Sequence, residues 1–195
     1  MYWQVYLHKT VLSAEYLLVN ILKRAKEIAG KGEELFCTPS LRDFLYNQYN
    51  KKDFNQNPQL LDLFAELDDY DIYTAVKVWT KHKDIVLSKL CRNMVNRNLY
   101  RVELQNQPFR QGIMEAIRDK VKKKYKLDDT EAGYFVFSGD VANDAYRTDK
   151  IKINIVSKDG QINDIADAAD HLNISALSKT VKKYFLCYPK DIPVI

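Results

Sequence analysis

Hydrophobic residues in the first part of the chain recur at the spacing of a helix. Five of them fall three or four positions apart and predict one buried stripe. They are Leu18, Ile21, Leu22, Ala25 and Ile28. Because no Pro or Gly precedes Gly30, we expect one long helix over residues 1–28. This helix would begin at Met1 with no capping residue in front of it, so we expect the chain to be the rear part of a longer protein.

Further helical patterns follow up to residue 96. Pro39 suits the first position of a second helix, and Pro58 opens a third after a polar loop over residues 51–57. Asp69 is expected to cap the next helix, and another helix ends near residue 96. The residues of the third helix expected to face the core are Leu60, Leu61, Phe64 and Ala65.

After residue 96 the pattern changes to the alternation that is typical of strands. Four strands are expected, at residues 100–104, 134–138, 151–155 and 184–188. Helices are expected over residues 109–125 and 163–172. This order of elements predicts a small sheet with helices packed on one face.

The two patterns together predict an α+β fold. Residues 1–96 would form an N-terminal helical segment, and residues 97–195 a lobe built on a small antiparallel or mixed sheet. We interpret the first part as the last helices of a larger helical domain and the second as a regulatory or oligomerisation lobe.

Composition narrows the classes of protein. Of the 195 residues, 46% are hydrophobic and 29% charged, as in globular proteins, and no apolar run reaches eighteen residues, which excludes a membrane span. The three cysteines, Cys37, Cys91 and Cys187, lie far apart, which favours free thiols and a cytoplasmic location. The net charge of +4 fits a small anionic ligand.

Two charged clusters allow two interpretations each. The lysines between Lys120 and Lys126 are more typical of a solvated helix end than of a nucleic-acid surface, because only Tyr125 interrupts them as an aromatic platform. The acids from Asp68 to Asp71 could bind Mg²⁺, but a helix cap is the stronger interpretation.

The six glycines form neither a Walker loop nor a dinucleotide fingerprint.

The start of the chain carries unusually polar chemistry for a core helix. Tyr6 and Lys9 fall on one side of the expected helix, and His8 falls on another. One interpretation is an exposed helix whose long side chains reach the solvent. The other is that these phenol, imidazole and ammonium groups face a ligand.

Two motifs carry a resemblance to a known family. At Tyr6-x-His8-Lys9 and again at Asn96-Arg97-Asn98-Leu99-Tyr100-Arg101, the chain resembles the C-terminal part of HD-domain phosphohydrolases, the superfamily of deoxynucleoside triphosphate triphosphohydrolases. The resemblance covers most of the chain. It implies that Tyr6 packs against the sugar or base of the substrate. It also implies that His8 and Lys9 border a regulatory nucleotide between subunits, and that Arg97 and Arg101 hold its phosphates.

The family's metal motif needs a His-Asp pair, and here no His is followed by Asp. Because metal-activated water drives this hydrolysis, we expect no catalytic or metal-binding residue in this chain and no activity by itself. The divalent metal would belong to a preceding HD region. The resemblance also implies nucleotide binding, of a dNTP or a GTP-like ligand, and homo-oligomers. The alternative is a non-enzymatic dimerisation or protein-interaction domain, in which Tyr6, His8 and Lys9 are structural.

Overall fold

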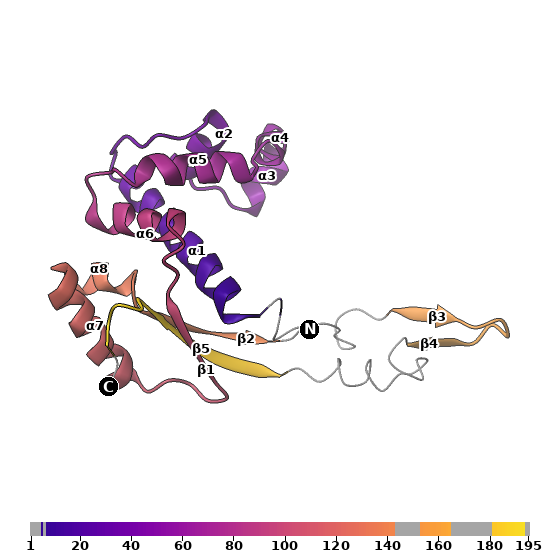
Figure 1. Ribbon diagram of the computed structural model, residues 1–195. Helices are drawn as coiled ribbons and strands as arrows, with labels where there is room; N and C mark the ends of the chain where they lie inside the picture. The colour runs from indigo at the N-terminus through magenta and orange to yellow at the C-terminus, as the bar shows by residue number, and fades with distance from the viewer. Residues whose placement is uncertain (1–4, 6, 143–152, 165–180, 194–195) are drawn as a thin grey trace.

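The computed structural model describes residues 5, 7–142, 153–164 and 181–193. Six helices form the first half: α1 (Lys9–Gly30), α2 (Pro39–Tyr46), α3 (Lys51–Gln56), α4 (Gln59–Ala65), α5 (Asp69–Trp79) and α6 (Ile85–Val95). The second half contains β1 (Arg101–Gln105), α7 (Gln111–Tyr125), α8 (Asp129–Gly133), β2 (Phe137–Ala142), β3 (Asn154–Val156), β4 (Ile162–Asp164) and β5 (Lys182–Tyr188). Figure 1 shows the helical half lying over one sheet, with the β3–β4 hairpin set apart. The fold is α+β, as predicted.

The first helix starts later than the sequence predicts. It begins at Lys9, and His8 is its N-cap: the His8 Nδ1 accepts a hydrogen bond from the backbone N–H of Thr10 at 3.2 Å. The prediction of an uncapped helix from Met1 is therefore wrong. Imidazole is an unusual cap, so the pattern of common cap residues could not reveal it. Of the predicted stripe, Ile21, Ala25 and Ile28 are buried, whereas Leu18 and Leu22 are half-buried and pack against the core.

The segment between α2 and α5 departs most from prediction. Residues 51–56, expected in a loop, form α3, which Asn50 and Asp53 stabilise with a capping box. In α4 only Leu60 is buried, whereas Leu61 and Phe64 are 60% and 55% exposed and Ala65 is also exposed. The prediction that all four residues face the core is therefore wrong, because helical spacing does not reveal which side of a short helix meets the protein.

The acids at the start of α5 form its cap. Asp68, not Asp69, is the N-cap: its side chain accepts from the backbone N–H groups of Tyr70 and Asp71, and the Asp71 carboxylate accepts from the Asp68 N–H at 2.9 Å. The hydrogen bond from the Asp68 N–H is the main cause that lowers the pKa of Asp71. Among the described residues, no three His, Cys, Asp or Glu side chains gather as a metal site would require.

The main sheet has three antiparallel strands in the order β1-β5-β2. Its register pairs Val102 with Cys187 and Leu104 with Phe185, so these residues share a face. Tyr16 of α1 packs on that face, with its ring centroid 4.6 Å from that of Phe185. One core extends from α1 through the sheet. The helical and strand parts meet in the connection from Val95 to Arg101, where the sequence places the boundary; a division into two domains stays a prediction.

Three other expectations need correction. The second strand is β2, at Phe137–Ala142, and residues 134–136 form the buried turn after the unpredicted helix α8. Ile113, expected on the inner face of α7, is 44% exposed. Asn163 and Asp164 belong to β4 and not to a helix, while residues 165–172 of that expected helix and residues 151–152 lie outside the described part. No described helix is both long enough and apolar enough to cross a bilayer.

Candidate functional site

Four cations from distant parts of the chain line one cavity of about 530 Å³. Lys9 is the first residue of α1, and Arg97 lies in the turn after α6. Arg101 begins β1, and Lys190 follows β5. Because β1 and β5 pair with Arg101 opposite Tyr188, the register brings Lys190 to the same end of the sheet. The core thus holds four positive side chains around one opening.

The backbone of Arg97 adopts a left-handed conformation, with φ 56°. It closes the end of α6: the Arg97 N–H donates to the Met94 carbonyl at 3.1 Å, and the Asn98 N–H donates to the Asn93 carbonyl at 2.8 Å. Glycine is the usual residue at this position, and a side chain there costs roughly 1–2 kcal/mol. Lys126 ends α7 in the same conformation, so what distinguishes Arg97 is its place in the lining of the cavity.

These cations have no acidic partners in the described part of the chain. No Asp or Glu described there forms an ion pair with any of the four. Glu103, two residues from Arg101 on the same strand, already accepts a hydrogen bond from the Tyr188 hydroxyl. Burial and this bond raise the pKa of Tyr188. Arg101 also interacts with the Tyr188 hydroxyl, but no carboxylate of the described residues neutralises any of the four charges.

A second cavity of about 430 Å³ adjoins the first, since both are lined by Arg97, Leu99, Tyr100 and Lys190. We call the two cavities together the basic cleft. The Lys89 ammonium lies 3.9 Å from the centre of the Tyr125 ring in this second part, and burial lowers the pKa of Lys89. A fifth cation thus lies against an aromatic face.

Asp191 is the acidic residue of the second cavity and is firmly held. Tyr125 donates to its Oδ1 at 2.7 Å, and Lys124 Nζ lies 2.8 Å from its Oδ2. Burial raises the pKa of Asp191, but the bonds from Lys124 and Tyr125 outweigh burial and lower it overall. Asp191 is therefore ionised at neutral pH and fixes the C-terminal segment that carries Lys190.

Three of the predicted site residues meet in the basic cleft: Lys9, Arg97 and Arg101. His8 precedes Lys9 but uses its Nδ1 as the helix cap, so its contact with a nucleotide stays a prediction. Tyr6 lies outside the described residues.

Sequence reasoning missed two cations of the cleft. Lys190 and Lys89 were missed because their proximity depends on strand register and helix packing, which no local pattern reveals.

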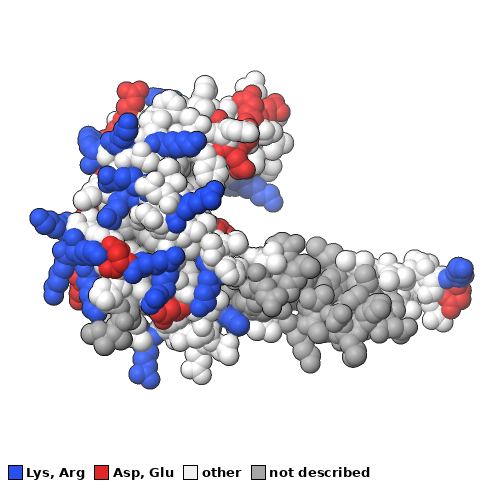
Figure 2. Space-filling model, in the orientation of Figure 1, with Lys and Arg blue, Asp and Glu red and all other residues white. Residues whose placement is uncertain are grey.

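The lysine cluster of α7 serves mainly internal contacts. Lys120 donates to the Pro193 carbonyl at 2.9 Å, Lys122 pairs with Asp129 at 2.6 Å, and Lys124 binds Asp191. In Figure 2, Lys and Arg side chains gather on the side formed by α6, α7 and α8. Because these three lysines are committed within the protein, this surface offers less to nucleic acid than the sequence count suggests.

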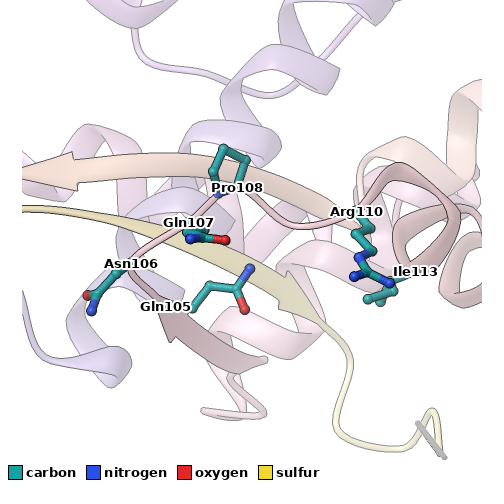
Figure 3. Close-up of a pocket in the computed structure, with 6 residues that line it drawn as sticks. All are labelled: Gln105, Asn106, Gln107, Pro108, Arg110 and Ile113. Carbon is teal, nitrogen blue, oxygen red and sulfur yellow. The ribbon is translucent and has the colours of Figure 1, made fainter.

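Another cavity, of about 480 Å³, lies between the end of β1 and the start of α7 (Figure 3). Arg110 is the cation of its described lining. The remaining lining residues are neutral: Gln105, Asn106, Gln107, Pro108 and Ile113. It is therefore less suited to a polyanion than the basic cleft.

Two known proteins are similar to nearly the whole length of this chain. No known family matches it in a scan of protein families. An uncharacterised protein of Bacillus subtilis strain 168, YwfO, is 28% identical over 200 residues, covering 98% of this chain and 43% of YwfO. A crystal structure of a phosphohydrolase from Bacteroides thetaiotaomicron VPI-5482 is 46% identical, with a TM-score of 0.84, over 97% of this chain and 47% of that one. The chain thus spans a little under half the length of these relatives, and over nearly all its own length it is similar in sequence and fold to part of a phosphohydrolase.

Proposed function

We propose that this chain is the nucleotide-regulatory part of an HD-domain phosphohydrolase that acts on (deoxy)nucleoside triphosphates. The observation that carries the proposal is the convergence of Lys9, Arg97 and Arg101 in one cavity. These are three of the residues for which the family resemblance implies contacts with a regulatory nucleotide. The similarity to a solved phosphohydrolase supports the reaction class.

The chemistry of the basic cleft suits a polyphosphate. Arginine grips phosphate oxygens through two parallel hydrogen bonds, while lysine acts as a compact charge that tolerates several geometries. The larger cavity, of about 530 Å³, lies within the range of small-molecule sites. The Tyr125 ring, with Lys89 on its face, and the amide of Asn93 extend the cleft beyond the other four cations and suit the base and sugar of a nucleotide.

In this proposal, hydrolysis takes place in an HD region outside this chain. The described residues offer no cluster of metal ligands. The parts of the relatives that this chain does not match are long enough to hold an HD metal centre. Tyr6 would contribute to the wall of the substrate pocket, and the regulatory nucleotide would act through α1, which begins at the cleft.

Binding of dGTP, dATP and inorganic triphosphate, measured by isothermal titration calorimetry at low salt, tests the proposal. We expect all three to bind the chain and their affinity to fall as salt rises. Arg97→Ala should weaken binding roughly 10- to 100-fold, because a hydrogen bond to a charged group contributes about 1.5–3 kcal/mol.

Arg110→Ala is the matched control, since it removes the same side chain from the cavity of Figure 3. Its affinity for the three ligands should equal that of the wild type. Absence of binding in the wild type, or equal losses in the Arg97 and Arg110 variants, would refute the assignment of the cleft.

A further inference from the structure

Lys89 is a half-buried lysine of α6 that lines the second cavity of the basic cleft. Its ammonium packs 3.9 Å from the centre of the Tyr125 ring. Within the described part of the chain, no carboxylate forms an ion pair with it. Asp191, the acid of the same cavity, is already bound by Lys124 and by the Tyr125 hydroxyl. The amine of Lys89 therefore lies at the cavity wall without a carboxylate to neutralise its charge.

The same cavity, of about 430 Å³, offers a place for a phosphate group beside this amine. Arg97 and Lys190 line it, and their charges have no carboxylate partner among the described residues. Lys89 and Asn93 are four residues apart and share one side of α6. Arg97 follows in the turn that closes this helix. An anion bound by Arg97 and Lys190 would thus lie in one cavity with the Lys89 amine.

The surroundings of Lys89 make its neutral form easier to reach than that of an exposed lysine. Burial is the main cause that lowers the pKa of Lys89, and the charges of Arg92 and Lys124 add to this effect, whereas Asp191 opposes it. Tyr125 stays neutral, because burial and its bond to Asp191 raise its pKa. The neutral amine is the nucleophilic form of lysine, so a larger fraction of Lys89 is reactive at a given pH.

We propose that Lys89 is a modification site, which small acyl phosphates acylate without the help of an enzyme. The phosphate of the reagent binds Arg97 and Lys190, and the neutral Lys89 Nζ attacks the acyl carbon. A bond from Nζ to this carbon forms while the bond from the carbon to the phosphate oxygen breaks. The phosphate leaves with that electron pair and takes up one amine proton. The products are an N-acyl-lysine and inorganic phosphate, and no oxidant or reductant takes part.

Acylation removes the charge of Lys89 and places an amide in the second cavity. The consequence for the regulatory nucleotide rests on the proposed function, whereas the modification itself needs only a cavity that holds one phosphate group. Lys89→Gln, which imitates the acylated side chain, should weaken dGTP binding by roughly threefold, because the cleft loses one of its cations.

Mass spectrometry of the full chain treated with acetyl phosphate tests the proposal, with the acetylated fraction measured at each lysine over time. Lys123 is the internal comparison, because it is exposed within the lysine cluster of α7 and is in the described lining of neither cavity. We expect Lys89 to react at least about fivefold faster than Lys123, since bound phosphate holds the acyl carbon near the amine. Equal rates at the two lysines would overturn the proposal.

An acylating reagent without a phosphate separates binding in the cleft from simple reactivity. With N-hydroxysuccinimidyl acetate, the ratio of the Lys89 rate to the Lys123 rate should fall, and an unchanged ratio would overturn the proposal. Arg97→Ala should slow the reaction of acetyl phosphate at Lys89 and leave Lys123 unaffected. Arg110→Ala, which removes an arginine from the cavity of Figure 3, should leave both rates at their wild-type values.

Inorganic triphosphate distinguishes a failure of this proposal from a failure of the proposed function. Triphosphate should slow acetylation at Lys89, because both reagents need Arg97 and Lys190. Triphosphate binding in calorimetry with no preference for Lys89 would refute the modification alone. Preferential acetylation of Lys89 without triphosphate binding would refute the proposed function and leave the modification in place.

Discussion

The Ser13 hydroxyl accepts a hydrogen bond from the backbone N–H of Tyr100 at 2.7 Å, although the two residues are 87 positions apart. Ser13 is completely buried in α1, and Tyr100 directly precedes β1. Tyr100 also lines both parts of the basic cleft. This bond therefore fixes the chain between Arg97 and Arg101 against the helix that carries Lys9.

Ser13→Ala should destabilise the fold because the Tyr100 N–H would stay buried without an acceptor. A buried unsatisfied group costs about 1–3 kcal/mol, which urea unfolding should show as a lower midpoint with an unchanged slope. Ser138→Ala is the control, since Ser138 is exposed on β2 and its loss should leave the midpoint in place. A Ser13→Ala midpoint equal to that of the control would contradict the role of this bond.

The ion pair of Arg24 and Asp84 should make stability depend on acidity. Arg24 is 8% exposed and binds both Asp84 oxygens, at 3.2 and 2.6 Å. Burial raises the pKa of Asp84, but bonds from Arg24 and from the Leu87 N–H outweigh burial and hold it below its ordinary value. The stabilisation is therefore complete above the unfolded pKa of about 3.9 and is lost as pH falls through the lower folded pKa.

Asp84→Asn should consequently lose the most free energy of unfolding near pH 7 and less below about pH 4. We expect a loss of about 1.5–3 kcal/mol at neutral pH, because Arg24 loses a bond to a charged group but keeps its ion pair with Glu27 at 3.2 Å. Urea unfolding curves of both proteins, measured at roughly every pH unit from pH 3 to pH 7, give the difference in free energy of unfolding at each pH. A difference in free energy of unfolding that grew as the pH fell would disprove this account.

Gly139→Ala should strain the sheet core. A methyl group at Gly139 would lie 2.8 Å from the Phe185 ring, which is 1% exposed and has Tyr16 packed against it. Overpacking of this kind costs about 1–3 kcal/mol, measurable as a lower melting temperature. In the control Gly112→Ala, the new methyl group meets no atom within 4 Å outside the backbone of its own helix α7, where alanine is preferred, so stability should hold or rise.

Arg97→Gly should separate stability from ligand binding. Glycine adopts the left-handed backbone of this position freely, so the fold should gain up to about 1–2 kcal/mol while triphosphate affinity falls. Lys126, with φ 57°, ends α7 in the same conformation, and Lys126→Gly should give the same gain with unchanged affinity. Melting curves and calorimetry on both variants decide the matter: equal affinities would mean that Arg97 has no part in binding.

The sequence indicated the secondary structure where local physics decides it. Helical spacing located α1, α5 and α6, and alternation located β1 and β5, because one buried face imposes a period on the chain. The short helices α3 and α8 escaped that pattern. Each is stabilised by a capping box, formed by Asn50 with Asp53 and by Asp128 with Glu131. The three-residue spacing of these pairs is visible in the sequence and could have predicted both helices.

The sequence alone also singled out Lys9, Arg97 and Arg101, through a family resemblance. Their convergence with Lys190 was decided only by the tertiary structure, because it depends on the pairing of β1 with β5 across more than eighty residues. The exposed side of α4 was likewise undetermined by its pattern of apolar residues. Periodicity reports that a face is apolar, but which surface covers that face depends on contacts between segments that are distant in the chain.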